Sequence, residues 1–142
     1  MTIARMIEGR NAAIVSCEAA TTVRDAITLL AERRIGALPV LAAGEVCGIF
    51  SERDIVYQLQ AQGPAVLERT VGEVMTAPAV TVAPETEVLE ALALMTLRRI
   101  RHLPVVTNGA MISFVSIGDL VKYRIELIES EAEAMRAYIQ TA

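Results

Sequence analysis

The sequence predicts an α/β fold, in its α+β arrangement, with two β-α-β-β-α units related by a pseudo-two-fold axis and a long C-terminal helix. Three observations lead to this prediction. Residues 23–56 align with residues 88–121 without a gap. In both units, short apolar runs alternate with stretches of helical period. After Asp119 the apolar residues keep a spacing of three and four, and this segment has no counterpart of equal length in the first unit.

Each unit is expected to begin with a short strand, at residues 13–16 and 79–82, because both runs are apolar and rich in β-branched residues. The helix that follows has its apolar residues on one face in both units. These residues are Val23, Ala26, Ile27 and Leu30 in the first unit, and Val88, Ala91, Leu92 and Met95 in the second. Thr22 with Asp25 predicts a capping box before the first of these helices, whereas Thr86 predicts a weaker cap before the second.

A hairpin and a further helix complete each unit. The segments RRIGALPV (33–40) and RRIRHLPV (98–105) lead into a strand, because proline is tolerated at the first residues of a strand. Gly44 in the first unit and Asn108-Gly109 in the second predict the tight turn into the next strand.

A serine followed three residues later by an aspartate stands at each predicted strand-to-helix junction, as Ser51 with Asp54 and as Ser116 with Asp119. One interpretation is helix capping, in which the serine oxygen accepts a hydrogen bond from a backbone N–H two or three residues later. The other is a ligand site, because exposed N–H groups and the helix dipole favour a phosphate, and a carboxylate can hold ribose hydroxyls. Two copies at matching places favour the ligand site.

The repeat also predicts the domain boundaries. We expect a first unit over residues 2–61, a linker over 62–69, a second unit over 70–123 and a C-terminal helical extension over 124–142. A similar segment opens each unit, TIARMI at the first and TVGEVM at the second. The spacing of these two segments gives the first unit about three extra residues near Arg10.

The C-terminal extension has an apolar seam with the a/d spacing of paired helices. The seam consists of Val121, Ile125, Ile128, Ala132, Met135 and Ile139, and Glu126, Glu129, Glu131 and Glu133 lie off it. Two interpretations remain open, a helix folded back on its own chain and a helix packed on a partner chain. The apolar content of 54% and the mean hydropathy of +0.45 favour the partner and a homo-oligomer.

Charge and hydropathy narrow the classes of partner. The net charge is −4 and no lysine or arginine stripe is dense enough for nucleic acid. No apolar stretch is long enough for a membrane span, and the N-terminus lacks the apolar core of a signal peptide. We therefore expect a cytoplasmic protein with neither a nucleic-acid nor a membrane partner.

The residue types needed for catalysis are sparse. Cys17 and Cys47 are isolated, which favours buried reduced thiols over redox or metal chemistry. The single histidine, His102, is expected to be a packed or cleft-lining side chain rather than a catalyst. The sequence has no phosphate-binding or dinucleotide motif and no convincing metal set. An enzyme is therefore not expected, and no cofactor is required.

The paired motifs resemble those of the tandem cystathionine-β-synthase-type (CBS) domain pair, or Bateman module, and especially those of small stand-alone bacterial CBS-pair proteins. The resemblance rests on TIARMI with TVGEVM, RRIGALPV with RRIRHLPV, and GIFSERDIV with VSIGDLVK, and it covers essentially residues 2–123. It implies that an adenosyl ligand, such as AMP, ADP, ATP, NAD(H) or S-adenosylmethionine, binds in two clefts between the units. It also implies a homodimer with a regulatory rather than catalytic role.

The resemblance further implies which residues bind the ligand. Asp54 and Asp119 would hold ribose hydroxyls, and Ser51 and Ser116 would reach phosphate or ribose. The other implied residues are Ile49 and Phe114 at the adenine slot, Gly36 and Arg101 facing the clefts, Ile35 and Ile100 as apolar walls, and Val15 and Val80 closing each site from the opposite unit.

Two differences make the implied sites unequal. Arg101 can pair with a phosphate, whereas Gly36 offers room but no charge. Ser113 stands where the first unit has Gly48, the residue that the family favours, which predicts a tighter second cleft.

We therefore expect a non-catalytic sensor whose regulatory ligand is an adenine nucleotide, with AMP the first candidate. Binding would favour one arrangement of the two units, and an unidentified partner protein would respond to that arrangement. The alternative is a structural or protein-interaction module that binds no nucleotide and acts through its C-terminal helix and apolar helix faces. Serine and aspartate at both junctions favour the sensor.

Overall fold

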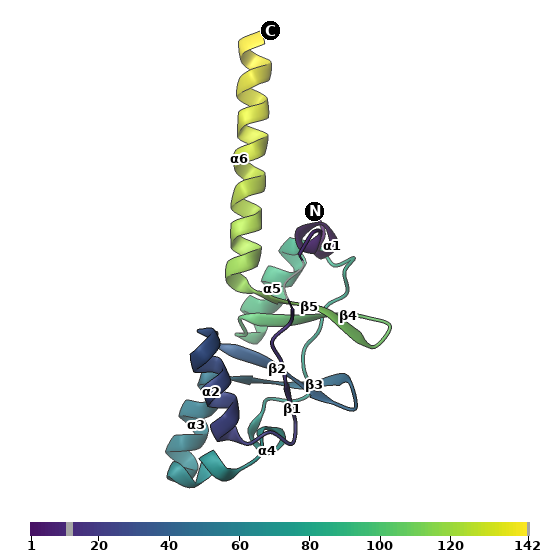
Figure 1. Cartoon of the computed structure of the whole chain (residues 1–142). Coiled ribbons are helices and arrows are strands. Elements are labelled where there is room, and N and C mark those ends of the chain that lie inside the picture. Colours follow the sequence, from purple (N-terminus) through teal and green to yellow (C-terminus); the bar gives the residue numbers. More distant parts are fainter. Residues whose placement is uncertain (11–12, 142) are drawn as a thin grey trace.

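The structure is a computed structural model that describes residues 1–10 and 13–141. Positions 11, 12 and 142, which fall within the predicted ranges 2–61 and 124–142, lie outside the described residues. Two small sheets form the centre of the body, helices cover their outer sides, and one long helix projects from one end (Figure 1). The predicted fold class is confirmed.

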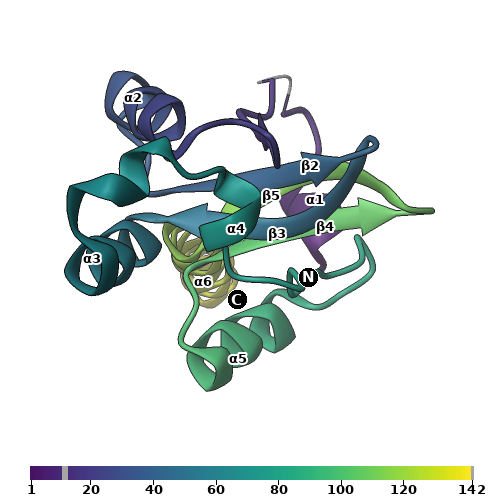
Figure 2. The ribbon, with the colours of Figure 1, turned by 90° about the horizontal axis from the view of Figure 1, so that it is seen from below.

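Each sheet is built around one hairpin. The first sheet has the order β1 (Cys17–Glu18), β2 (Ala37–Ala42) and β3 (Glu45–Ser51), and the second consists of β4 (His102–Thr107) and β5 (Ala110–Ser116). The hairpin turns were predicted correctly, since Ala43-Gly44 and Asn108-Gly109 both have positive φ at their two central residues. The sheets meet along β3 and β5, which lie side by side at the centre of the body (Figure 2).

The strands predicted before each first helix are wrong in position or length. Residues 13–16 form no strand, and β1 begins at Cys17, which pairs in parallel with Val40. In the second unit only Val82 of the predicted strand pairs, with Val105. Cys17 and Val82 are the buried members of these segments, so pairing is confined to the point where the chain enters a core.

Each unit has one short helix followed by two longer ones. The helices are α1 (Ile3–Ile7), α2 (Val23–Arg33), α3 (Glu52–Gln62), α4 (Val71–Val74), α5 (Val88–Arg98) and α6 (Ile117–Thr141), with a 3-10 helix, η1 (Gly63–Glu68), in the predicted linker. The Oγ1 of Thr22 caps α2 by accepting from the Asp25 N–H at 3.2 Å. The N-cap of α5 is Glu87 rather than Thr86, and it makes no side-chain cap hydrogen bond.

The short helix that opens each unit packs in the core of the other unit. Ile3 and Met6 of α1 pack in the core of the second sheet, and Val71 and Val74 of α4 pack in the core of the first. Backbone bonds fix both helices, for example from the Ile3 N–H to the carbonyl of Thr86 at 2.9 Å. Each core is thus completed by the helix that precedes the other unit in the sequence, so the packing joins both units.

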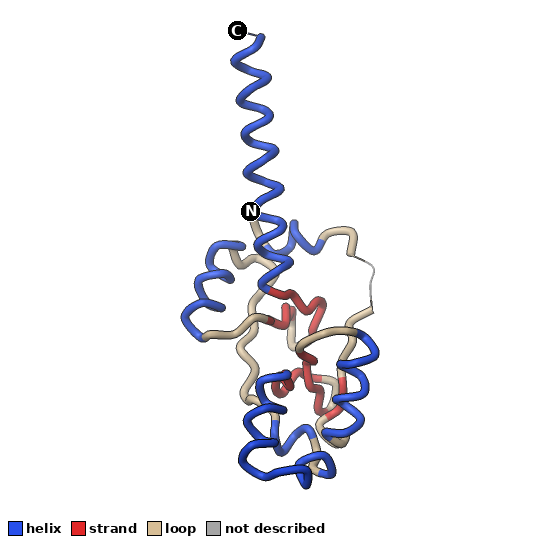
Figure 3. Tube along the Cα trace, turned by 90° about the vertical axis from the view of Figure 1, so that its left-hand side faces the viewer, coloured by secondary structure: helices blue, strands red, loops and turns tan. Residues whose placement is uncertain are grey.

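Helix α6 leaves the body after its first turns. Leu120 is fully buried, but the remainder of the 25-residue helix extends away from both sheets (Figures 1 and 3). Five of the six seam residues are between 42% and 66% exposed. The interpretation of a helix folded back on its own chain is therefore wrong. Within the described part of the chain, no helix is both long enough and apolar enough to cross a bilayer.

Candidate functional site

A cavity of about 310 Å³ lies between the first unit and the β4–β5 hairpin, a volume at the lower end of the range of small-molecule sites. Its walls come from α1 and the segment after it, from the start of β2, from the hairpin and from the start of α6. The lining residues are Ile7, Arg10, Ala13, Ile14, Val15, Ile35, Ala37, His102, Ile112, Ser113, Phe114, Ser116 and Asp119. Most of this surface is apolar, and its charges are concentrated at Arg10 and Asp119.

The junction of β5 and α6 places a carboxylate at one end of the cavity. The Ser116 N–H donates to Oδ2 of Asp119 at 2.9 Å, and the Asp119 N–H donates to Oγ of Ser116 at 3.1 Å. These reciprocal bonds confirm the capping interpretation for this junction. They occupy only one carboxylate oxygen, so capping and ligand binding are compatible at Asp119.

The second carboxylate oxygen of Asp119 faces Arg10. Nη2 of Arg10 lies 3.4 Å from Oδ1, and both side chains are more than a third exposed. Partial burial acts to raise the pKa of Asp119, but the Ser116 hydrogen bonds and the Arg10 charge outweigh it and hold the pKa below its ordinary value. Asp119 is therefore ionised at neutral pH and is an acceptor for hydroxyl groups.

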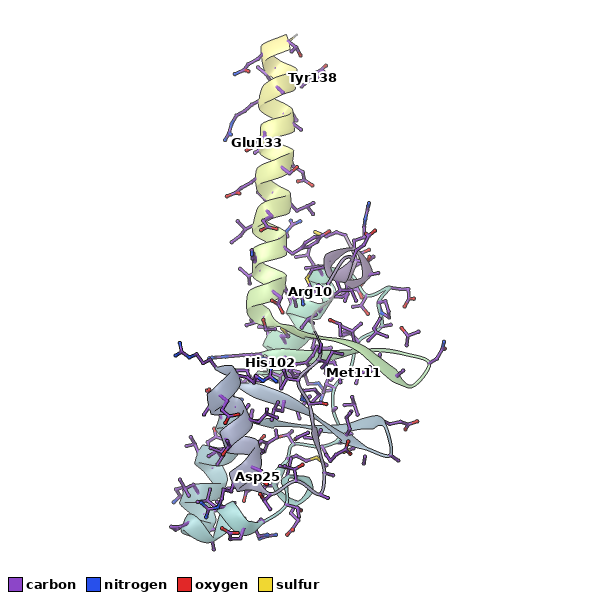
Figure 4. The ribbon with its side chains drawn as sticks, in the orientation of Figure 1. Arg10, Asp25, His102, Met111, Glu133 and Tyr138 are labelled. Carbon is purple, nitrogen blue, oxygen red and sulfur yellow. The ribbon has the colours of Figure 1, made fainter. Side chains whose placement is uncertain are left out.

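An aromatic pair forms the wall beside this carboxylate. The rings of His102 and Phe114 stack with their centroids 5.4 Å apart and their planes 13° from parallel. Burial is the main cause that lowers the pKa of His102, so the imidazole is neutral at pH 7. Because the two rings partly cover one another's faces, the uncharged pair offers a planar heterocycle the free face of one ring. Arg10 and His102 both lie where α6 leaves the body (Figure 4).

Five of the predicted site residues meet at this cavity. Val15 and Ile35 come from the first unit, and Phe114, Ser116 and Asp119 come from the second. The cavity also confirms that His102 is a cleft-lining side chain. Sequence reasoning missed Arg10 as a site residue, although the extra residues before the first unit marked its position.

The equivalent junction of the first unit has a different environment. Helix α3 is capped in the same way as α6, because the Ser51 N–H donates to Oδ2 of Asp54 at 2.9 Å. Oδ1 of Asp54, however, accepts a hydrogen bond from the Thr76 hydroxyl at 2.8 Å. Thr76 also pairs with Ile49 through two backbone bonds of 2.9 Å each. Ile49, Ser51 and Asp54 thus lie together, but a neighbouring segment of the same chain occupies the acceptor.

The absence of a side chain at Gly48 allows Met75 and Thr76 to approach the sheet closely. A Cβ at Gly48 would lie 2.6 Å from Sδ of Met75 and 2.8 Å from the carbonyl oxygen of Thr76. Ser113, at the equivalent place in the second unit, lines the cavity instead. The sequence predicted a tighter second cleft, but the close approach is found in the first unit, at Gly48.

The four remaining predicted residues do not line the cavity. Gly36 and Arg101 are equivalent, because the carbonyl of each accepts a bond from the first N–H of the following helix, at 3.1 and 2.8 Å. Arg101 is exposed, and the charge that faces Asp119 is that of Arg10. Val80 and Ile100 are partly buried against the core of the second sheet.

The two cysteines differ in burial. Cys17 is buried, and burial is the main cause that raises the pKa of its thiol to about 11. Cys47 is half-buried, with its Sγ 3.4 Å from the carbonyl oxygen of Val40. Both are free thiols, and the described residues contain no cluster of three or more metal-ligating side chains.

Comparison with known families gives two matches along the chain. The CBS domain family model matches residues 10–61 and residues 71–126. The chain is 40% identical over 129 residues to "CBS domain-containing protein CBSX3, mitochondrial" of Arabidopsis thaliana, covering 87% of this chain and 63% of the relative. It is 33% identical over 99 residues to CBS domain-containing protein YhcV of Bacillus subtilis (strain 168), covering 70% of each. The chain therefore spans less than two thirds of CBSX3, and 22% of CBSCBSPB1 of Arabidopsis thaliana.

Solved structures show the same architecture. A CBS-domain protein from Burkholderia ambifaria MC40-6 matches with a TM-score of 0.82 and 38% identity, covering 89% of this chain and 95% of that one. A CBS-domain protein from Agrobacterium tumefaciens matches with a TM-score of 0.82 and 33% identity, covering 87% and 99%. CBSX2 in complex with AMP matches with a TM-score of 0.75 and 26% identity, covering 89% and 97%.

Proposed function

The chain belongs to the CBS-domain family as a tandem pair, and on this premise we propose that it is a non-catalytic regulatory module that binds an adenine nucleotide, with AMP the first candidate. The observation that carries the proposal is the cavity at Asp119, which combines an ionised acceptor, an uncharged aromatic pair and one cation. A structural relative, CBSX2, was solved in complex with AMP.

The chemistry of the cavity suggests how the nucleotide is oriented. Asp119 accepts from the ribose hydroxyls through the oxygen that now faces Arg10, and the Ser116 bond keeps the carboxylate in place. The adenine ring lies against the pair of His102 and Phe114, and Ile35 of the first unit also lines the cavity. Arg10 exchanges its contact with Asp119 for the phosphate, which is the better partner for a guanidinium. ADP, ATP, NAD(H) and S-adenosylmethionine share the adenosine part and are competing candidates.

The regulatory part of the proposal follows from the origin of the walls. Val15 and Ile35 belong to the first unit, and Phe114 and Asp119 belong to the second. A ligand that contacts all four stabilises one relative arrangement of the units, and a partner protein responds to that arrangement. We further propose a homodimer in the cytoplasm. The Arabidopsis thaliana relative CBSX3 is named as a mitochondrial protein.

The two junctions are proposed to bind unequally. At Asp54 the Thr76 hydroxyl already donates to the oxygen that a ribose would need. A ligand there has to displace Thr76, and with it the backbone bonds between Thr76 and Ile49. At Asp119 the ligand displaces a partly exposed ion pair, which is a weaker contact. The cavity at Asp119 is therefore expected to fill first.

Calorimetric titration tests the proposal. The chain is titrated with AMP, ADP, ATP, NADH and S-adenosylmethionine, and at least one is expected to bind. Because a hydrogen bond to a charged group contributes about 1.5–3 kcal/mol, Asp119→Ala should weaken the tighter site roughly ten- to a hundredfold. Asp54→Ala is the matched control and should leave that site nearly unchanged. If none of these ligands binds, the alternative of a protein-interaction module without a nucleotide is correct.

A further inference from the structure

The outer part of α6 carries an apolar seam that no described residue of its own chain covers. Ile125, Ile128, Met135 and Ile139 are each between 47% and 66% exposed. From Val121 to Ile139 the seam runs for about 27 Å at 1.5 Å per residue. Figure 4 shows Glu133 and Tyr138 on this projecting part, well beyond the sheets. A helix of this kind becomes stable when a second helix covers its apolar seam.

The charges beside the seam fit a second copy of the same helix. With Ile125 at an a position and Ile128 at the following d position, Arg124 and Glu131 occupy g positions, and Glu129 and Arg136 occupy e positions. In a parallel pair in register, each g residue faces the e residue five positions later on the other helix. Arg124 then faces Glu129, and Glu131 faces Arg136. The two-fold axis repeats both contacts, so all four pairs join opposite charges.

The antiparallel arrangement that covers the whole seam brings like charges together. If Ile128 lies opposite Ala132, each Glu129 faces the other Glu129, and each Glu131 faces the other Glu131. Lys122 then faces Arg136, which is also a like-charge pair. Shifting the antiparallel pair by one heptad brings opposite charges together, for example Lys122 with Glu129 when Ile125 lies opposite Ile128, but leaves part of the seam uncovered. Among these arrangements, the parallel pair is the one that combines opposite charges with a fully covered seam.

The four charged side chains are available for such pairs. Glu129, Glu131 and Arg136 are exposed, and the ion pairs found among the described residues include none of the four. Arg124 is half-buried and contacts Sδ of Met1 at 3.4 Å, a weak acceptor that a carboxylate readily replaces.

We propose that two copies of the chain associate through α6 as a parallel, in-register coiled coil. The interface consists of the seam and of the pairs Arg124–Glu129 and Glu131–Arg136. It rests on the homodimer of the proposed function and adds the interface and the orientation. The parallel arrangement places both nucleotide-binding bodies at the same end of the coiled coil.

Disulfide trapping in the full-length chain tests the register. Ile128→Cys places a thiol at a d position, where the two copies of a parallel pair meet, and mild oxidation is expected to give a covalent dimer on non-reducing gels. Ser130→Cys is the matched control, because an f position faces away from the partner helix. The unsubstituted chain shows whether Cys17 or Cys47 contributes to cross-linking.

Charge reversal tests the orientation without removing apolar contacts. In the parallel pair, Glu131→Lys turns two attractive contacts into repulsive ones, and the dimer should dissociate roughly tenfold more readily in analytical ultracentrifugation. Adding Arg136→Glu should restore the affinity. Glu133→Lys is the control with the same change of charge at a position outside the e and g pairs, and it should have little effect.

The outcomes separate this inference from the proposed function. A monomeric unsubstituted chain overturns both the homodimer and the coiled coil. A dimer in which Ile128→Cys fails to cross-link, or in which Glu131→Lys behaves like Glu133→Lys, overturns the parallel coiled coil and leaves the homodimer intact. A trimer also overturns it. AMP titration of the same samples tests the nucleotide site independently of the oligomeric state.

Discussion

Arg10 is expected to oppose the binding of adenosine and to favour the binding of AMP. Its guanidinium lies 3.4 Å from the Asp119 oxygen that a ribose hydroxyl would use, so a ligand without a phosphate has to break this contact without replacing it. AMP breaks the same contact but offers its phosphate to Arg10 in return. Arg10→Gln should therefore change the two affinities in opposite directions.

The sizes of the two effects follow from the exposure of the ion pair. Because both side chains are more than a third exposed, their contact contributes about 0.2–1 kcal/mol, and its removal should tighten adenosine binding roughly 1.4- to fivefold. For AMP, Arg10→Gln also removes the ion pair that the ligand has to break, but this gain is outweighed by the lost contact of Arg10 with the phosphate, which contributes about 1.5–3 kcal/mol. The net effect is a loss of about 0.5–2.8 kcal/mol, or AMP binding that is roughly two- to a hundredfold weaker.

Calorimetry with both ligands measures the two constants for the native chain and for Arg10→Gln. Arg5→Gln is the matched control, since Arg5 is an exposed arginine of the same segment that does not line the cavity. It removes the same charge and should leave both affinities within about twofold, because an exposed arginine that does not line the cavity makes no direct contact with the ligand and its charge is screened by solvent and salt. If adenosine and AMP weaken equally in Arg10→Gln, Arg10 only supports the fold. If neither affinity changes, Arg10 does not contact the ligand.

Three further predictions concern stability and titration. The C2 proton of His102, the single histidine, should titrate in NMR with a midpoint below about 6.5. Because the folded chain then binds fewer protons than the unfolded chain, the free energy of unfolding should fall as the pH drops from 6.5 through that midpoint. A midpoint above 6.5 would contradict the burial argument. Gly48→Ala should destabilise the chain by about 1–3 kcal/mol in urea unfolding, whereas Ser113→Ala at the equivalent cavity position should have less effect, and equal losses would refute the packing explanation. In a Cys47→Ala background, Cys17 should react with a thiol reagent at pH 8 only after unfolding, since its pKa is about 11; rapid reaction of the folded chain would show that this thiol is accessible.

The features that the sequence predicted well are local or repeated. The gapless repeat predicted both hairpins and both serine–aspartate junctions, because turn residues and caps act over two to four positions. The prediction of a strand at residues 13–16 was wrong because apolar content does not show where the segment leaves the sheet. Val15 is apolar for a different reason, as part of the cavity wall.

The features that the sequence could not predict depend on contacts between distant segments. The two short N-terminal helices look alike in sequence, and only the folded chain shows that each packs in the other unit's core. The contacts of Arg10 with Asp119 and of Thr76 with Asp54 likewise join residues far apart in the chain. They make the two junctions unequal, as expected, but through residues other than Gly36 and Arg101.

A crystal structure of the chain grown with AMP tests the central claim most directly. The account predicts AMP in the cavity at the start of α6, with its ribose hydroxyls on the Asp119 carboxylate, its adenine against His102 and Phe114, and its phosphate on Arg10. AMP bound away from Asp119, or a cavity that stays empty at saturating AMP, would contradict the account.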